Sequence, residues 1–326
     1  SLLGADGRAH PGDADSVGAV AQRWDTFAGS RRTQNRLEDS GRQAPDSGRF
    51  RNEPDTDPAI TPNRTWAKRA LANDPGEHGV QEVTDPSAVE SYVARAKELG
   101  TEWGKRPAAE RAAALDAVAD QLAAKRGDFI SVAAYEANKT VTQTDPEVSE
   151  AIDFCTYYGQ SARFLEEAHS EFHPHTVTVV TPPWNFPIAI PTGGIAASLA
   201  AGSAVIVKPA PQVVHCGKMV VEAFRTALEA EGLDPDLVQL VLTDEGDAGK
   251  ALLSHDDVDN IILTGASDTG ALFRSWKPKM NIMAETSGKN ALVITVGPWA
   301  ATKLRSWRTR CTAPSGTRYR KSITSE

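Results

Sequence analysis

The chain has 326 residues, of which 40% are hydrophobic and 24% charged, and its formal net charge is −8. This composition is typical of a globular protein with one large or two ordinary domains. The negative charge argues against nucleic acid or an anionic membrane as the main partner. No apolar stretch approaches the roughly 18–20 residues of a membrane span.

The three cysteines, Cys155, Cys216 and Cys311, form no CxxC pair and are odd in number. This favours a reducing compartment and free thiols over disulfides, so we expect a cytoplasmic protein. The N-terminus has neither the basic and apolar regions of a secretory signal nor an initiator Met. We therefore expect a fragment or a processed product.

The first half of the chain is polar and then helical in pattern. Residues 1–60 are rich in Asp, Arg, Gly, Pro and Ser with little periodic apolar content, which predicts a linker or weakly ordered arm. Within residues 87–170, apolar residues recur at three- and four-residue intervals. This spacing predicts helices over 88–99 and 108–122 and a further helix that starts at Pro146.

From Thr176 the pattern alternates between strand and helix. Short β-branched runs predict strands at residues 177–181, 204–207, 238–242, 261–264, 281–284 and 291–295. Helical patterns lie between the earlier runs, at residues 217–231 and 248–253. Such alternation predicts a parallel, doubly wound α/β sheet, and ligands of these sheets bind at the carboxyl ends of the strands.

Residues 297–326 differ again, because they hold seven Lys and Arg but a single acidic residue. This stretch therefore carries +6, whereas the preceding 296 residues carry −14. It has no helix or strand periodicity. Two interpretations stay open, a genuine basic tail and the aberrant end of an out-of-frame or spliced coding sequence, and we favour the second.

A short proline-bounded motif follows the first predicted strand. Pro183-Trp184-Asn185-Phe186-Pro187 comes directly after residues 177–181, and its two prolines stiffen the loop. A stiff loop at the carboxyl end of a strand can direct the Asn185 amide at a developing oxyanion. An ordinary turn asparagine is the alternative interpretation.

Two further motifs are suited to a dinucleotide. Lys208 ends the strand at 204–207, and a charged head there can bond to ribose hydroxyls, although a solvated lysine is the alternative. Thr264-Gly265-Ala266-Ser267-Asp268-Thr269-Gly270 opens a helix after another strand. Gly265 allows close backbone approach, and the helix N-terminus with Ser267 can meet a pyrophosphate.

Glu285 follows the predicted strand at 281–284 and precedes Ser287-Gly288. A carboxylate at this position can accept a proton from a thiol or from the hydrolytic water, if burial raises its pKa. A glutamate that caps backbone amides is the alternative. We expect Gly288 to permit the tight turn that such exposure requires.

In this order the motifs, ending with Glu285-Thr286-Ser287-Gly288-Lys289-Asn290, resemble the cofactor half of an NAD(P)-dependent aldehyde dehydrogenase. The resemblance implies a Rossmann-like fold, NAD⁺ as cofactor and an aldehyde substrate. It assigns stabilisation of the oxyanion to Asn185 and general-base catalysis to Glu285. The cofactor-binding residues that it implies are Pro183, Trp184, Lys208, Gly249, Gly265, Ser267 and Gly270. Because Ala266 stands where the family usually has Ser, Ser267 lies one position late, and we expect its backbone to bind.

The nucleophilic cysteine of this family lies beyond Glu285 in a Gly-Gln-x-Cys context, which this chain lacks. Cys311 has neighbouring arginines that would lower its thiol pKa, but no Gly or Gln precedes it. We expect Cys155 in the core. Cys216 lies at a helix start, where a thiolate is favoured, without a base in any motif. We therefore expect the nucleophile and most of the catalytic domain to be missing.

Other strings narrow the branch of the family. Residues 51–57 and 63–67 resemble the junction after the proline dehydrogenase barrel in bifunctional proline-utilisation enzymes, and residues 147–154 also fit that branch. The resemblance covers about residues 48–296. It implies oxidation of L-glutamate γ-semialdehyde to glutamate by a homo-oligomeric enzyme. A nucleotide-binding fragment without turnover, an unstable truncation and an aldehyde dehydrogenase of another substrate class stay open.

The chain therefore divides into an arm, a cofactor-binding region and a tail. We expect these to cover residues 1–60, 61–296 and 297–326, with helices over 87–170 and the α/β part over 176–296. His169, His173 and His175 form a short cluster. Because no fourth ligand stands at a known spacing, we expect a surface loop there rather than a metal site.

Overall fold

The computed structural model describes residues 34–39, 41–42, 50–167 and 172–287. Up to Thr286 these residues belong to one compact unit, and its centre is a five-stranded sheet of order β3-β2-β1-β4-β5. All neighbouring strands are parallel. The strands are β1 (Val177–Thr181), β2 (Ala204–Val207), β3 (Val238–Leu240), β4 (Asn260–Gly265) and β5 (Ile282–Thr286).

The central strands are buried on both faces. Every residue of β1 and β2 is buried, which explains why β2 is a continuous run of Ala, Val and Ile and why β1 consists of β-branched Val and Thr. In register, Val180 pairs with Val207, and Thr181 pairs with Leu263. The carboxyl ends of β1, β2 and β4 therefore meet at one edge. The strand order reverses between β1 and β4, which is where ligands of such sheets bind.

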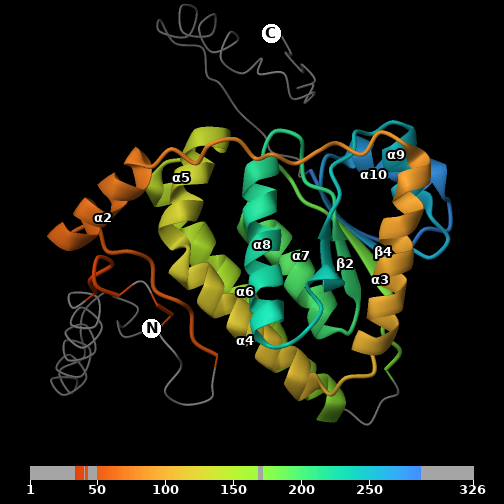
Figure 1. The fold of residues 1–326 in the computed structure, drawn as a ribbon, viewed down its shortest axis with the longest axis horizontal. Helices are drawn as coiled ribbons and strands as arrows, with labels where there is room; N and C mark the ends of the chain where they lie inside the picture. Colours follow the sequence, from red (N-terminus) through yellow and green to blue (C-terminus); the bar gives the residue numbers. More distant parts are fainter. Residues whose placement is uncertain (1–33, 40, 43–49, 168–171, 288–326) are drawn as a thin grey trace, which may run out of the picture. The chain divides into compact units, whose positions relative to one another are not determined.

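Helices cover the sheet and extend it into a helical layer. Figure 1 shows α3 on one side of the sheet and α4, α5 and α6 on the other, and α3 contacts β1, β2 and β3. The helices are α2 (Thr61–Ala72), α3 (Val89–Trp103), α4 (Ala108–Ala124), α5 (Arg126–Ala137), α6 (Val141–Glu167), α7 (Ala189–Ala200), α8 (Val214–Ala230), α9 (Asp247–Ser254) and α10 (Ser267–Trp276), with short 3-10 turns η1 (Pro86–Ala88) and η2 (Pro235–Leu237).

The predicted α/β fold is confirmed, and several element boundaries are corrected. α6 begins at Val141 rather than at Pro146, which lies inside the helix. Pro146 is the sixth residue of α6, so the helix lacks the backbone hydrogen bond that this residue would otherwise donate to Thr142 O. Helix α2 was not predicted from the sequence. The predicted strand at 291–295 lies outside the described residues.

Residues 34–39 and 50–60 form no helix or strand, as expected of a linker, yet they pack closely against the helical layer. Arg36 and Glu53 are buried, with Arg36 Nη2 3.7 Å from Glu53 Oε1. Thr56 N and Oγ1 each donate to the Asp145 carboxylate at 2.6 Å. Arg126 is fully buried and lies 3.4 Å from Glu53 and 3.1 Å from Asp145. A buried ionic network therefore fixes this segment to α5 and α6.

None of the helices in the described ranges combines the length and apolar character that a membrane crossing requires.

Candidate functional site

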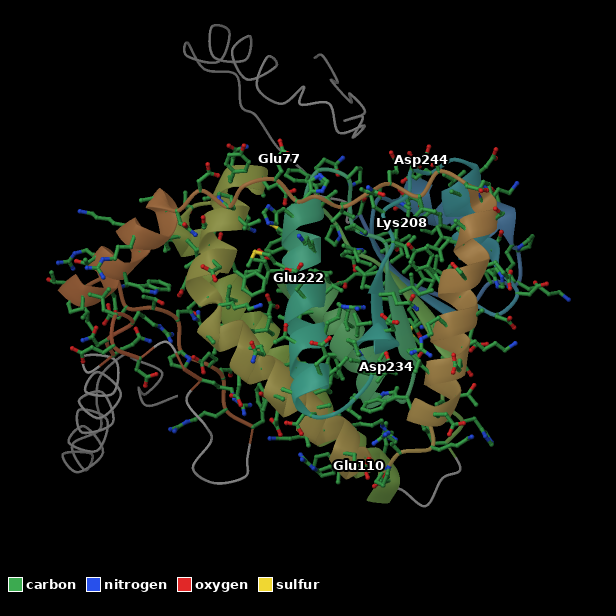
Figure 2. All side chains as sticks on the ribbon, viewed as in Figure 1. Glu77, Glu110, Lys208, Glu222, Asp234 and Asp244 are labelled. Carbon is green, nitrogen blue, oxygen red and sulfur yellow. The ribbon has the colours of Figure 1, made fainter. Side chains whose placement is uncertain are left out.

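The structure places most of the motif residues at the carboxyl edge of the sheet. Asn185 lies in the loop after β1, Lys208 directly follows β2, and Gly265 ends β4. Figure 2 shows Lys208 and Asp244 near the same end of the sheet. This gathering follows from the parallel register of the strands, because the residues after parallel strands share one edge.

Lys208 is a nearly buried cation at this edge. Its backbone N–H donates to Val180 O at 2.9 Å, which extends the β1–β2 ladder, and the residue is only 7% exposed. Within the part of the chain that the structure describes, its ammonium makes no hydrogen bond or ion pair. Burial lowers the pKa of Lys208, and Glu245, Asp244 and Glu82 partly oppose this shift. The ammonium can therefore donate to the oxygen atoms of a ligand.

Gly249 has a packing role that the structure makes explicit. A Cβ at this position would lie 2.1 Å from Asp244 O and 3.0 Å from Thr243 Oγ1. Only glycine therefore lets the first turns of α9 pack against the turn that follows β3. Asp244 Oδ1 also accepts a hydrogen bond from Gly246 N at 2.8 Å. Gly249 thus fixes the acidic turn beside Lys208.

The β4–α10 junction leaves room for a ligand. Among the described residues, a Cβ on Gly265 would meet only Leu263 Cδ1, at 3.7 Å, so no packing within this part of the chain requires glycine there. α10 begins at Ser267, and its N-cap residue Ala266 gives no side-chain cap. The N–H groups of the first turn, including that of the exposed Ser267, can therefore bind an anion. A Cβ on Gly270 would meet Leu263 Cδ2 at 3.5 Å and Thr286 Cγ2 at 3.7 Å, which are ordinary contact distances.

The Pro183–Pro187 loop is half exposed. Trp184 and Phe186 are 44% and 47% exposed, and Pro183 is half-buried. The Asn185 carbonyl accepts a hydrogen bond from Lys139 Nζ at 2.8 Å. Among the described residues, the Asn185 side-chain amide makes no hydrogen bond. The backbone of the loop is therefore held while the amide is free to donate.

Glu285 lies within β5 rather than after it, and it pairs in register with Thr264. The residues of β5 after Ile282 are exposed, Glu285 among them. The expected role of Glu285 as a general base depends on burial of its carboxylate. In the described part of the chain that burial is not observed.

The two described cysteines are buried and make poor nucleophiles. Cys155 lies in the core on α6, as predicted, and burial raises the pKa of its thiol. Cys216 lies near the start of α8, where a thiolate was expected; instead burial and then the neighbouring Glu136 raise its pKa. This corrects the expectation, because desolvation and a like charge outweigh the helix terminus. Cys311 lies outside the described residues.

The histidine cluster gains no support as a metal site. His173 and His175 are exposed, and His175 Nε2 lies 3.3 Å from Asn281 Nδ2. No group of His, Cys, Asp or Glu within the described ranges could hold a metal ion. His169 is outside these ranges.

Sequence reasoning assigned no role to Lys139, Glu147 and Glu136, which hold the loop after β1 and the start of α8. Lys139 Nζ lies 2.8 Å from Glu147 Oε1, and Glu136 accepts from the backbone N–H groups of His215 and Cys216. One local signal was available. Asn138 has a left-handed φ of 53°, and asparagine is common at the ends of helices in this conformation.

Known proteins share both the sequence and the fold. The aldehyde dehydrogenase family matches residues 77–297. Over 225 residues the chain is 35% identical to the bifunctional protein PutA of Escherichia coli (strain K12), covering 66% of this chain and 16% of that protein. It is 29% identical over 234 residues to 1-pyrroline-5-carboxylate dehydrogenase of Bacillus licheniformis, covering 66% of this chain and 44% of that protein.

A solved structure agrees with these relatives. Proline utilization A (PutA) from Corynebacterium freiburgense is 49% identical with a TM-score of 0.67, and the match covers 76% of this chain and 24% of that one. The chain thus spans less than half the length of each of these relatives. The family match takes in all five strands and every described helix from α3 onward. The chain belongs to the aldehyde dehydrogenase family.

Proposed function

We propose that the chain binds NAD⁺ at the carboxyl edge of its sheet, as part of an enzyme that oxidises L-glutamate γ-semialdehyde to glutamate. The observation that carries this proposal is Lys208, a residue that is only 7% exposed at that edge and whose ammonium has no partner among the described residues. A ligand that offers hydroxyl oxygens would satisfy it. The substrate is supported by the names of the relatives, which are PutA and 1-pyrroline-5-carboxylate dehydrogenase.

The described residues fit a dinucleotide in three places. Lys208 would bond to the ribose hydroxyls, the uncapped N-terminus of α10 would bind the pyrophosphate, and Gly265 leaves space for close approach. Helix N-termini and donor side chains at strand ends are the usual means of binding such groups. When bound, NAD⁺ supplies the hydride acceptor. Gly249 contributes through packing, by fixing the turn after β3.

The charges around Lys208 favour NAD⁺ over NADP⁺. Glu245, Asp244 and Glu82 all raise the pKa of Lys208 electrostatically, so three carboxylates act on this site. Glu82 is brought there by a parallel bridge to Leu242, just beyond β3. A phosphate on the ribose would add negative charge next to these groups. A ribose with two free hydroxyls meets no such repulsion.

The chain's own residues would then act on the aldehyde. The Asn185 side-chain amide would donate a hydrogen bond to the aldehyde oxygen as negative charge develops there. Glu285 would take a proton from the attacking water during release of glutamate. The nucleophile that starts covalent catalysis is not among the described residues, whose two cysteines are both buried.

A second candidate function is NAD⁺ binding without turnover. It is favoured by the burial of both described cysteines. Thiols whose pKa is raised by burial are protonated at neutral pH and attack aldehydes slowly. The exposed position of Glu285 points in the same direction. The two functions share the cofactor site and differ only in whether NADH forms.

Calorimetric titration with NAD⁺ tests the shared part. We expect Lys208→Met to weaken NAD⁺ binding at least tenfold, while Lys218→Met, at a partly exposed pair with Glu222 on α8, leaves it within twofold. Equal affinities in the two variants would refute the site.

A second comparison uses the double variant Asp244→Asn with Glu245→Gln, which should raise the affinity for NADP⁺ relative to NAD⁺. Absorbance at 340 nm with L-glutamate γ-semialdehyde then separates the two functions.

A further inference from the structure

The loop that carries Asn185 is held from outside by one buried ion pair. Lys139 Nζ lies 2.8 Å from Glu147 Oε1, and the two side chains are 11% and 1% exposed. The same ammonium donates to Asn185 O at 2.8 Å and lies 4.6 Å from the centroid of the Phe186 ring. A single cation therefore contacts the middle of the loop through a carbonyl and an aromatic face.

Glu147 holds the end of the same loop. Its Oε2 accepts hydrogen bonds from Ile188 N at 2.8 Å and Ala189 N at 3.3 Å. These are the N-cap and first residue of α7, which has no side-chain cap of its own. Glu147 on α6 therefore caps α7, where a negative charge is also favoured by the helix dipole.

The position of Lys139 depends on the end of α5. Asn138 adopts a left-handed conformation there, with φ 53° and ψ 32°, and Lys139 N donates back to Ala133 O at 3.2 Å. This turn ends the helix and leaves Lys139 within reach of both Glu147 and the loop. The pair, called the Lys139–Glu147 clamp below, thus joins α5, α6 and the loop after β1.

We propose that the Lys139–Glu147 clamp positions the Asn185 amide for catalysis, although neither residue contacts the substrate. Pro183 and Pro187 fix their own φ angles, and Pro187 also restricts the preceding Phe186, but neither proline fixes the backbone of Asn185. The bond from Lys139 to Asn185 O fixes the peptide plane from which the Asn185 side chain projects. This inference rests on the proposed role of Asn185 as donor to the aldehyde oxygen.

The charges of the clamp suit this role. Because both side chains are largely buried, the pair is little screened by solvent, and removal of one partner leaves an uncompensated charge. Loss of Lys139 would therefore release the Asn185 carbonyl and weaken the cap on α7 together. Loss of an exposed lysine such as Lys105, paired with Glu102 at 65% and 71% side-chain exposure, would release neither.

Hydrogen exchange measured by mass spectrometry tests the positional part without any need for turnover. The variants are Lys139→Met, Lys139→Arg and Glu147→Gln, with Lys105→Met as control. We expect Lys139→Met and Glu147→Gln to raise exchange at least tenfold in peptides that cover residues 184–189, with little change in β1 and α8. Lys139→Arg should restore more than half of the protection. A uniform rise across the chain, or no rise at 184–189 relative to Lys105→Met, would overturn the clamp.

Kinetics and cofactor binding test the catalytic part. We expect Lys139→Met to lower kcat for NADH formation at least tenfold while the Kd for NAD⁺ stays within twofold of the unmodified chain, and Lys139→Arg to recover much of kcat. A fall in kcat with an equal loss of NAD⁺ affinity would indicate a merely structural role and refute positioning. If the unmodified chain forms no NADH, it binds NAD⁺ without turnover, which is the second candidate function. The ¹⁵N shift of the Asn185 side-chain amide then decides the positioning, because Lys139→Met must move it and Lys105→Met must not.

Discussion

The Glu136 carboxylate lies beside Cys216 and accepts a hydrogen bond from its backbone N–H at 2.9 Å. One acidic side chain on α5 thus caps α8 and, after the effect of burial, raises the pKa of the Cys216 thiol. A helix start usually favours a thiolate. Here the thiol pKa is raised instead, first because the thiol is buried and then because the carboxylate that caps the helix repels negative charge on sulfur.

This relationship makes stability depend on pH above the ordinary pKa of a thiol, 9.0. Below that pH the Cys216 thiol is protonated in both states and contributes no pH dependence. Above it the unfolded state loses the proton and the folded state keeps it, so the free energy of unfolding falls as pH rises. We expect this fall to be less steep in Cys216→Ala, by up to about 1.4 kcal/mol per pH unit. Urea unfolding between pH 8 and 10 gives the free energy of unfolding of the unmodified chain and of Cys216→Ala. Parallel plots of this free energy against pH would contradict the prediction.

Two glycines at the carboxyl edge should respond differently to a methyl group. Gly249→Ala places a Cβ 2.1 Å from a backbone oxygen, so we expect the free energy of unfolding to fall by about 1–3 kcal/mol, as for an overpacked core. Gly265→Ala meets only a leucine methyl at 3.7 Å and should cost under about 0.5 kcal/mol, as surface changes usually do. NAD⁺ affinity should nevertheless fall at least tenfold in Gly265→Ala. Unchanged affinity in this variant would remove Gly265 from the cofactor site.

Lys208 gives the proposed cofactor site its own pH dependence. Its pKa is lowered by burial, so the free protein loses this charge at a lower pH than an ordinary lysine, whose pKa is 10.5. Bonding to ribose hydroxyls favours the ammonium, and NAD⁺ affinity should therefore decline as pH rises through the lowered pKa. In Lys208→Arg the charge persists, and any remaining affinity should stay level over the same range. Titrations from pH 7 to 10 measure this; equal slopes would count against Lys208.

The free protein should show the opposite trend in stability over that window. Between the lowered pKa of Lys208 and 10.5, the unfolded state binds more protons than the folded state. The contribution of Lys208 to the free energy of unfolding therefore rises with pH. Comparison with Lys208→Met isolates this contribution, because that variant lacks the titrating group. We expect Lys208→Met to have the higher free energy of unfolding at neutral pH, and the difference from the unmodified chain to decrease as pH increases.

Arg126 should be far more important for stability than an exposed arginine. It is fully buried, with Glu53 and Asp145 as its carboxylate partners and Ser149 as a further acceptor. Arg126→Met leaves the two carboxylates buried without this cation, and we expect a loss of about 3–5 kcal/mol. The control Arg106→Met removes an exposed pair with Glu110 and should cost no more than about 0.5 kcal/mol. Chemical unfolding compares the two, and similar losses would disprove the importance of the network.

The sheet could be predicted from the sequence because its strands are local runs of buried residues. The strands predicted at 177–181 and 204–207 agree with β1 and β2. Those predicted at 238–242, 261–264 and 281–284 differ from β3, β4 and β5 by one or two residues at their ends. Lys208 and Asn185 then followed from the rule that ligands meet the carboxyl ends of parallel strands. Boundaries failed where proline was taken as a helix start, as at Pro146 in α6.

The remaining features depend on partners that are distant in the sequence. The bond from Lys139 to Asn185 joins residues 46 apart, and that from Cys216 to Glu136 joins residues 80 apart. No local pattern specifies such a pairing. The packing of Glu53 against Arg126 likewise depends on a residue 73 positions away. The polar composition of residues 50–60 therefore predicts a linker. Their burial depends on contacts with α5 and α6, which the local sequence does not reveal.

The strand order has a consequence for the way the chain folds while it is being made. β1 lies in the middle of the sheet. The hydroxyl of Thr181 in β1 donates a hydrogen bond to Ile262 O in β4, which comes 81 positions later in the chain. When the ribosome has synthesised β2, only one edge of β1 can be paired. The other edge stays unpaired until β4 has been synthesised. During that interval a strand of three valines and two threonines exposes unpaired backbone groups, which are templates for other chains. Nascent chains between these two points should be the ones that most need a chaperone.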